Sequence, residues 1–101
     1  GAGTSGGANS YIQADLGSFR HVSRVEVKSA GSGMAGGWGQ YPCRVQYRNT
    51  SNGWVTLRDF TSSLMPRDYI TNIPVGTQTN AVRIINTNNS YCCAGTFRVF
   101  G

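Results

Sequence analysis

A glycine-rich segment from Gly31 to Gln40 carries two apolar side chains that could contact a ligand. Five of its ten residues are glycine, and Met34 and Trp38 stand among them. This composition is typical of a loop, and such a loop cannot easily bury an indole ring. The face of Trp38 is suited to stacking on a sugar ring or to entering a membrane interface. Alternatively, Trp38 folds over the end of the domain and completes its core.

A second polar segment runs from Asn86 to Cys93. Its amide and hydroxyl groups suit the hydroxyl groups of a sugar, and Tyr91 adds an aromatic ring beside them. The residues that carry these groups are Asn86, Asn88, Asn89 and Ser90. The same residue types are equally typical of an ordinary turn.

The acidic residues and the histidine offer little for catalysis. Asp59 and Asp68 could supply the carboxylate pair of a glycoside hydrolase, but nothing in the sequence positions them. We expect a hydrogen-bonding role for Asp15, a solvated or salt-bridged role for Glu26, and a surface position for His21. The glycine-rich segment lacks the following helix that a phosphate-binding loop needs. The sequence therefore predicts a protein that is not an enzyme.

The cysteines leave several arrangements open. The chain has three, Cys43, Cys92 and Cys93, and a zinc site would need a fourth ligand that His21 is not spaced to supply. Cys43 could bridge to Cys92 or Cys93 and close a long loop. Alternatively, Cys92 and Cys93 form a strained disulfide between adjacent residues, or the thiols stay reduced. No metal site or cofactor is predicted, and calcium dependence is left open.

Composition and charge indicate a small domain with basic strand faces. The chain has 101 residues, enough for one domain, and 14 of them are glycine. Its net charge is +5, from eight arginines and one lysine against four acids. The basic residues are spread along the chain and alternate with apolar ones. This spacing favours solvated strand faces over a dedicated anion-binding patch, and no nucleic-acid partner is expected.

Alternation of apolar and polar residues predicts an all-β fold, an antiparallel β-sandwich or jelly roll. Asn52-Gly53 indicates a hairpin, because both residues accept positive φ. We expect Pro74 to end its strand or to mark an edge, and Trp54 to lie in the core. No stretch shows the period of an amphipathic helix. The expected strands are 11–16, 22–28, 43–48, 54–57, 69–73, 81–85 and 96–100.

An ordered set of segments resembles discoidin domains, also called coagulation-factor type C domains. Tyr11–Gly17 (YIQADLG) resembles their W/Y-[IL]-Q-[VAI]-D-L-G strand. Cys43–Arg48 with Trp54 resembles their hairpin, and Phe97–Gly101 resembles their last strand. The segments 21–25 and 81–84 also match in order and spacing. The resemblance covers 11–101 and implies a galactose-binding-like jelly roll.

The resemblance also implies where a ligand would bind. Ligands of such domains meet loops at one end of the barrel, here 31–41 and 86–93. Arg44 begins its strand close to that end and could contact a carboxylate or a sulfate. The candidate ligand-binding residues are Met34, Trp38, Gln40, Tyr41, Arg44, Asn88, Asn89, Ser90 and Tyr91.

Residues 1–10 depart from the resemblance, because the family carries more chain ahead of its first matching strand. We expect them to be a linker, or the remnant of a longer N-terminus, before a domain at 11–101. An edge left open there could pair with another chain.

The sequence thus predicts a non-catalytic adhesion module, extracellular or on the cell surface, that binds carbohydrate or glycoprotein. The alternative is a structural assembly domain of an extracellular fibre or matrix, pairing with neighbouring copies or chains. Anionic phospholipid has less support, because only Met34 and Trp38 could insert, and membrane contact would be peripheral. Asn49 and Asn88 begin N-glycosylation acceptor sequences.

Overall fold

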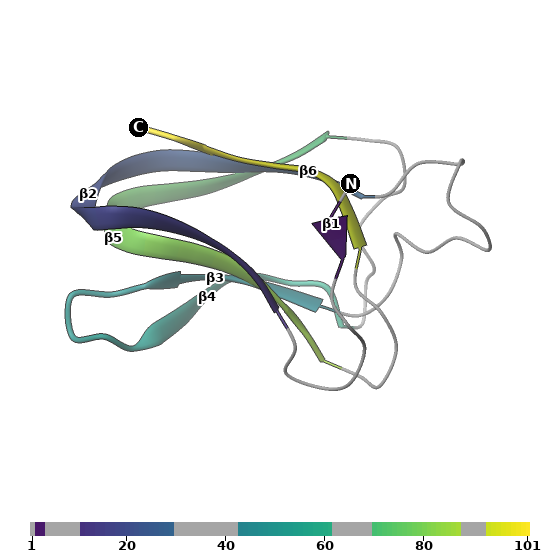
Figure 1. Cartoon of the computed structure of the whole chain (residues 1–101), viewed down its shortest axis with the longest axis horizontal. Helices are drawn as coiled ribbons and strands as arrows, with labels where there is room; N and C mark the ends of the chain where they lie inside the picture. Colours follow the sequence, from purple (N-terminus) through teal and green to yellow (C-terminus); the bar gives the residue numbers. More distant parts are fainter. Residues whose placement is uncertain (1, 4–10, 30–42, 62–69, 88–92) are drawn as a thin grey trace.

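Six β-strands make up the part of the chain that the computed structural model describes, residues 2–3, 11–29, 43–61, 70–87 and 93–101 (Figure 1). No helix occurs in these ranges, so none there is long and apolar enough to cross a membrane. The all-β prediction is confirmed. The strands are β1 (Ala2–Gly3), β2 (Tyr11–Ser29), β3 (Cys43–Arg48), β4 (Trp54–Asp59), β5 (Ile70–Asn86) and β6 (Cys93–Phe100).

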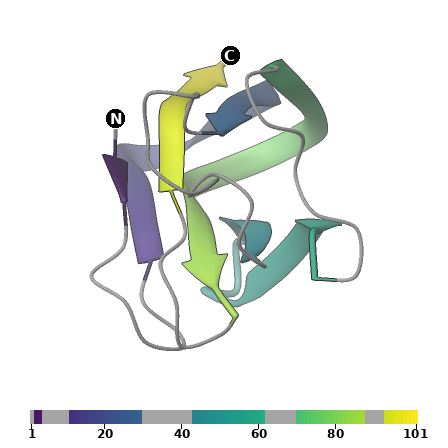
Figure 2. The ribbon, with the colours of Figure 1, turned by 90° about the vertical axis from the view of Figure 1, so that its right-hand side faces the viewer.

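The strands form one antiparallel sheet, in the order β1-β6-β2-β5-β3-β4, that bends over on itself. Two long neighbouring strands, β2 and β5, make the bend together (Figures 1 and 2). Gly17 on β2 has a φ of 83°, and Gly76 on β5 has a φ of 67°. The pairing register of β2 with β5 also shifts between Asp15 and Arg20. Residues other than glycine rarely adopt such φ values, so these two glycines allow both strands to turn the corner.

The bend produces the two layers of a sandwich. One layer contains β1, β6, the second half of β2 and the first half of β5. The other contains the first half of β2, the second half of β5, β3 and β4. The layers lie above and below each other in Figure 1, joined where β2 and β5 curve.

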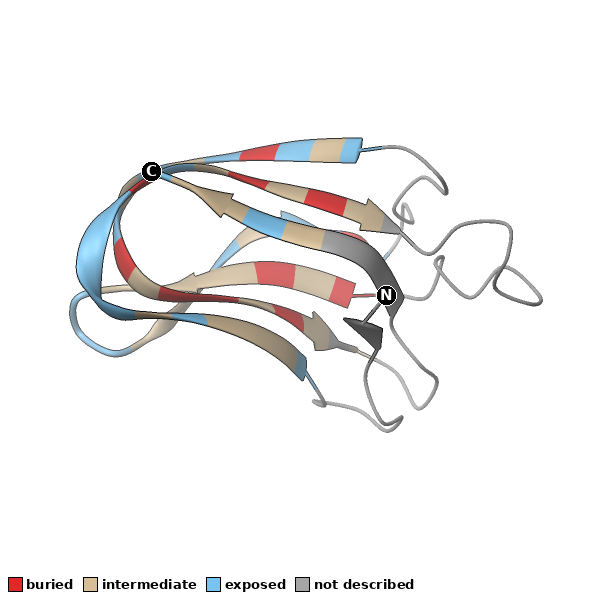
Figure 3. Cartoon of the chain, turned by 45° about the horizontal axis from the view of Figure 1, so that its top comes forward, coloured by how far each residue is buried: buried red, intermediate tan, exposed pale blue. Residues whose placement is uncertain are grey.

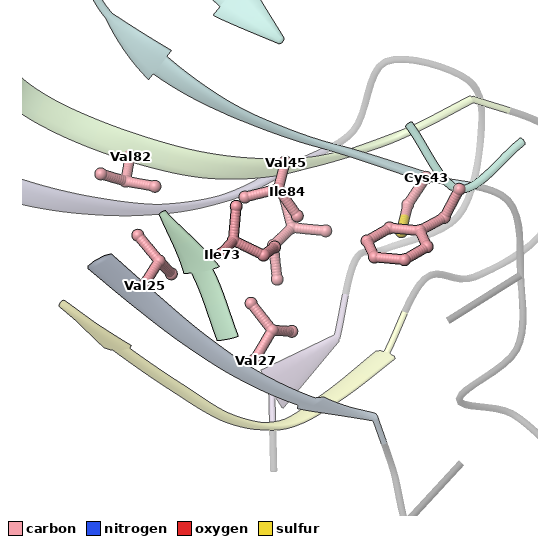
Figure 4. Close-up of a cluster of buried hydrophobic side chains, with 8 residues drawn as sticks. Val25, Val27, Cys43, Val45, Ile73, Val82 and Ile84 are labelled. Atoms are coloured by element: carbon pink, nitrogen blue, oxygen red, sulfur yellow. The ribbon is translucent and has the colours of Figure 1, made fainter. Parts of the chain in front are cut away.

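The core lies between the layers and is built from every second residue of the strands (Figures 3 and 4). Val25, Val27 and Ile73 come from one layer, and Val82 and Ile84 come from the other. All five have at most 1% of their surface exposed. Complete burial of a valine or isoleucine side chain contributes about 1.5–3 kcal/mol. Cys43, Val45 and Phe60 complete the same cluster.

The strands β2 and β5 each span two of the strands expected from the sequence. The expected strands 11–16 and 22–28 are one strand, β2, because Gly17 permits a bend without a break. The expected end at Pro74 is wrong, since β5 continues through this residue to Asn86. The alternative position of Pro74 at an edge is confirmed. Among the residues that the structure describes, only β2 pairs with β5 around Pro74, so no second described strand requires the amide hydrogen that proline lacks.

The predicted hairpin joins β3 to β4, but its turn differs from the simple Asn-Gly expectation. Arg48 pairs with Trp54, which leaves five residues in the connection, and only Asn52 has a positive φ, 64°. Asn49 organises the turn. Its Oδ1 accepts hydrogen bonds from the backbone amides of Ser51 (3.0 Å) and Gly53 (2.8 Å).

The N-terminal segment contributes to the sheet. Ala2 pairs with Ala94, and Gly3 with Cys93, so β1 adds a short strand beside β6. Part of the expected linker at 1–10 is therefore paired with the domain.

Candidate functional site

The strands that flank the two predicted ligand loops end at the same end of the sandwich. Cys43, the first residue of β3, pairs with Asn86, the last residue of β5. Ser29, the last residue of β2, pairs with Ala94 near the start of β6. These four strand ends lie together on the right of Figure 1. We call this region the loop end.

Most of the predicted ligand-binding residues lie outside the described residues. Cys92 and the second glycosylation candidate, Asn88, are also outside them. The ligand candidates concerned are Met34, Trp38, Gln40, Tyr41, Asn88, Asn89, Ser90 and Tyr91. Their roles therefore stay predictions.

Arg44 is the ligand candidate that the structure describes, and it is paired with Asp59 at the loop end. Arg44 Nε donates to Asp59 Oδ2 at 3.1 Å, and the side chains are 43% and 47% exposed. Asp59 Oδ1 accepts a hydrogen bond of 2.9 Å from the backbone amide of Thr61. The hydrogen bonds from Thr61 and Arg44 lower the pKa of the Asp59 carboxyl below its ordinary value. An exposed carboxylate thus stands beside an exposed guanidinium.

Sequence reasoning missed the role of Asp59 as the partner of Arg44. The two residues are opposite each other on β3 and β4, but the register shifts between Val45 and Gln46. Counting outward from the Asn52-Gly53 turn does not predict that shift. Asp68, the other member of the carboxylate pair considered for catalysis, lies outside the described residues.

A second arrangement occupies the outer surface of the layer that contains β3 and β4. It consists of Tyr11, Gln46, Arg48, Trp54 and Arg83, and we call it the arginine–aromatic face. The guanidinium carbon of Arg83 lies 4.0 Å from the centre of a Trp54 ring and 5.5 Å from that of Tyr11. The guanidinium carbon of Arg48 lies 4.8 Å from the Trp54 ring.

Strand pairing brings these residues together from four strands. Arg83 on β5 pairs with Gln46 on β3, and Arg48 on β3 pairs with Trp54 on β4. Val82 and Ile84 point into the core, so Arg83 between them faces outward. The prediction that Trp54 belongs to the core is wrong. It is partly exposed and supports two guanidinium groups on the outer surface.

Gln46 holds Arg83 in place. Its Oε1 accepts a hydrogen bond of 2.8 Å from Arg83 Nε, and its Nε2 donates to Thr56 Oγ1 at 3.1 Å. Partial burial lowers the pKa of Arg83, and the charge of Arg48 acts in the same direction, whereas Tyr11 opposes both. The guanidinium still carries its positive charge at neutral pH, because arginine starts from a very high pKa.

The outer surface of the opposite layer carries a shallow hollow of about 230 Å³, lined by Glu26, Lys28, Ile70 and Arg98.

Glu26 forms an ion pair of 3.1 Å with Arg24, in agreement with the salt-bridged role expected for it. His21 is exposed, and Gln13 donates to Asp15 at 2.6 Å, as the sequence predicts for these residues. No group of three or more metal-ligating side chains occurs among the described residues.

The predicted disulfide bonds and N-glycosylation sites remain predictions. Cys43 is 1% exposed and packs in the core, whereas the side chain of Cys93 is not among those described. Asn49 is partly buried, and its Oδ1 is engaged in the β3–β4 turn.

Comparison with solved structures finds carbohydrate-binding modules. CpGH89CBM32-4 from Clostridium perfringens, in complex with GlcNAc-α-1,4-galactose, matches with a TM-score of 0.64 and 16% identity. The match covers 92% of this chain and 62% of that one. The CBM32 of AlyQ, in complex with 4,5-unsaturated mannuronic acid, gives a TM-score of 0.68 and 18% identity over 96% of this chain and 74% of that one.

The family 32 carbohydrate-binding module of Streptococcus pneumoniae EndoD gives a TM-score of 0.64 at 11% identity, covering 97% of this chain and 73% of that one. Comparison of the sequence with protein-family models and with curated proteins finds no match. At sequence identities of 11–18%, the similarity to these modules concerns the fold alone. The chain adopts the galactose-binding-like jelly roll that family 32 carbohydrate-binding modules share with discoidin domains.

Proposed function

We propose that the chain is a non-catalytic carbohydrate-binding module that binds glycans or glycoproteins through its loop end. The main support for this proposal is the jelly-roll fold, which the chain shares with modules solved in complex with sugars. The strand ends that flank segments 31–41 and 86–93 lie together at the loop end. A role in adhesion outside the cell or at its surface is part of this proposal.

The exposed pair of Arg44 and Asp59 suits recognition of sugar hydroxyl groups. Asp59 stays ionised because two hydrogen bonds hold its charge, so its oxygens accept hydrogen bonds. Arg44 uses its Nε for Asp59. Its terminal amino groups make no hydrogen bond to a described residue, so they can donate to a sugar hydroxyl or carboxylate. Trp38 and Tyr91 are proposed to stack on sugar rings, and Asn88, Asn89 and Ser90 to supply further polar contacts.

A glycan array tests this function. We expect the wild-type chain to bind a subset of glycans, and Arg44→Ala and Trp38→Ala each to weaken that binding about tenfold or more, the loss of one charged hydrogen bond or one stacked ring. Arg20→Ala is a matched control. Arg20 is an exposed arginine near the Gly17 bend, where it donates to the Leu16 carbonyl oxygen at 3.2 Å.

A chain that keeps its melting temperature but binds no glycan would contradict the proposal. Self-association of the same chain in light scattering would then favour the structural assembly role. Equal weakening by Arg20→Ala and Arg44→Ala would mean that binding depends on net charge rather than on the loop end.

A further inference from the structure

The arginine–aromatic face gathers positive charge without neutralising it. Neither Arg48 nor Arg83 forms an ion pair with any described residue. Arg24, on the other layer, shows the contrast. It stacks over Phe100 at 3.9 Å, but it also pairs with Glu26 at 3.1 Å and donates to Asn72 at 2.9 Å. Stacking on an aromatic ring is therefore common to both layers. The arginine–aromatic face differs because no described carboxylate pairs with its two arginines.

The two uncompensated guanidinium groups lie around the same indole ring. They repel each other. Burial is the main cause of the lowered pKa of Arg83; Tyr11 opposes it, and the charge of Arg48 acts in the same direction as burial. In addition, Arg48 Nε is buried and has no hydrogen-bond partner among the described residues. A buried donor without a partner is unfavourable. An anion between the two groups would relieve the repulsion.

The face is also ordered before any ligand arrives. Trp54 supports both guanidinium planes, and Gln46 binds Arg83 through Nε. The terminal amino groups of Arg83 make no hydrogen bond to a described residue and remain as a pair of donors. Such a fixed fork matches the two oxygens of a carboxylate or sulfate, and a preformed site loses less entropy on binding.

We propose that the arginine–aromatic face binds an acidic glycan chain, with Arg48 and Arg83 holding its carboxylate or sulfate groups. Tyr11 is 54% exposed and offers a ring for the adjoining sugar. Gln13 and Thr56 lie on the same outer surface, beside Arg83 and Gln46. Gln13 donates to Asp15 at 2.6 Å, so its Oε1 remains to accept from a sugar hydroxyl. The net charge of +5 favours a polyanion over a neutral partner. This surface adjoins the loop end, since Tyr11 and Arg44 both pair with Ile85. Its test rests on Arg48 and Arg83, which have no part in the function proposed for the loop end.

Titration calorimetry with defined polymers tests this site. We expect oligogalacturonate to bind and its fully methyl-esterified form not to bind, because esterification removes the charge. A second comparison uses dextran sulfate and neutral dextran. The polyanion with the higher affinity, oligogalacturonate or dextran sulfate, shows whether the site prefers carboxylate or sulfate. Arg48→Gln and Arg83→Gln should each weaken binding about tenfold, the contribution typical of one charged hydrogen bond. Binding should also weaken as salt is added.

Arg24→Gln is the matched control, since it removes a stacked arginine of the other layer and changes net charge equally. It should leave the affinity unchanged within about twofold. Arg83→Lys keeps the charge but loses the fork, and we expect an intermediate affinity from a chain that folds normally. Wild-type affinity in a folded Arg48→Gln/Arg83→Gln double variant would overturn the proposal. So would equal weakening by Arg24→Gln, equal binding of the esterified polymer, or tighter binding of a single-stranded oligonucleotide of matched charge.

Discussion

At the scale of single residues, the pairing of Arg44 with Asp59 changes what each side chain can do. The carboxylate accepts from the Thr61 amide at 2.9 Å and from Arg44 Nε at 3.1 Å. Both bonds favour the ionised form, so the pKa of Asp59 falls below its ordinary value of 3.8. Since both side chains are exposed, the pair is more important for binding than for stability.

The lowered pKa gives a pH prediction. The ionised form of Asp59 stabilises the fold above its ordinary pKa, and this contribution disappears as pH falls through the lower folded pKa. Asp59→Asn should therefore have a lower melting temperature than wild type at about pH 7, and this difference should be smaller at about pH 2. Thermal unfolding followed by circular dichroism measures it. A gap of the same size at both pH values would contradict the assignment.

At the scale of elements, the decisive feature is that β2 and β5 bend together. Gly17 and Gly76 supply the positive φ values, 83° and 67°. A Cβ atom at either position would meet nothing within 4 Å. A substitution there is therefore unfavourable because of backbone strain and not because of crowding. The buried Thr79 fastens the bend to β3, because its hydroxyl lies 2.8 Å from the carbonyl oxygen of Arg48.

Alanine at either glycine separates strain from packing. Gly17→Ala and Gly76→Ala should each lower the free energy of unfolding by about 1–2 kcal/mol, the cost of a left-handed backbone for an L-residue. Asparagine should cost less at both sites, because it tolerates this conformation better. Urea unfolding provides the measurement. Gly101→Ala is the control, since its Cβ would meet only the His21 carbonyl oxygen, at 3.7 Å. A loss at Gly101 as large as at Gly17 would argue against strain at the bend.

At the scale of the whole molecule, the two layers depend on one thin apolar core. The cluster consists mainly of valine and isoleucine side chains from both layers, and the outer surfaces carry the charges. One strand shows both environments. On β5, Ile84 is 1% exposed in the core, whereas Ile70 is 57% exposed on the outer surface.

Replacing these two isoleucines tests the division between core and surface. Ile84→Ala should lower the free energy of unfolding by about 2–5 kcal/mol, because it removes buried methyl groups and leaves a cavity. Ile70→Ala should change it by no more than about 0.5 kcal/mol. Both values come from urea unfolding at the same pH. Similar losses in the two variants would mean that the sandwich does not pack as described.

The sequence by itself determined the fold class and the inward faces of the core strands, but not the outward position of Trp54. Alternation in Val25–Val27 and Val82–Ile84 predicts which residues enter the core, because successive strand residues point to opposite sides. Asn52-Gly53 predicts the hairpin, since Asn tolerates positive φ. The ordered segments from Tyr11 to Gly101 predict the jelly roll. All of these signals lie within a few neighbouring residues or in the order of the chain.

Only the tertiary structure decided which distant side chains meet. Arg48, Trp54 and Arg83 are spread along the chain. The even spacing of the arginines predicts solvated strand faces without a cluster. The order of the strands places them on one face. The register shift between Val45 and Gln46 brings Asp59 opposite Arg44. The apolar pattern and the turn set the register of a hairpin locally. The strand order and the irregularity between Val45 and Gln46 depend on how the whole sandwich packs, so no local pattern contains them.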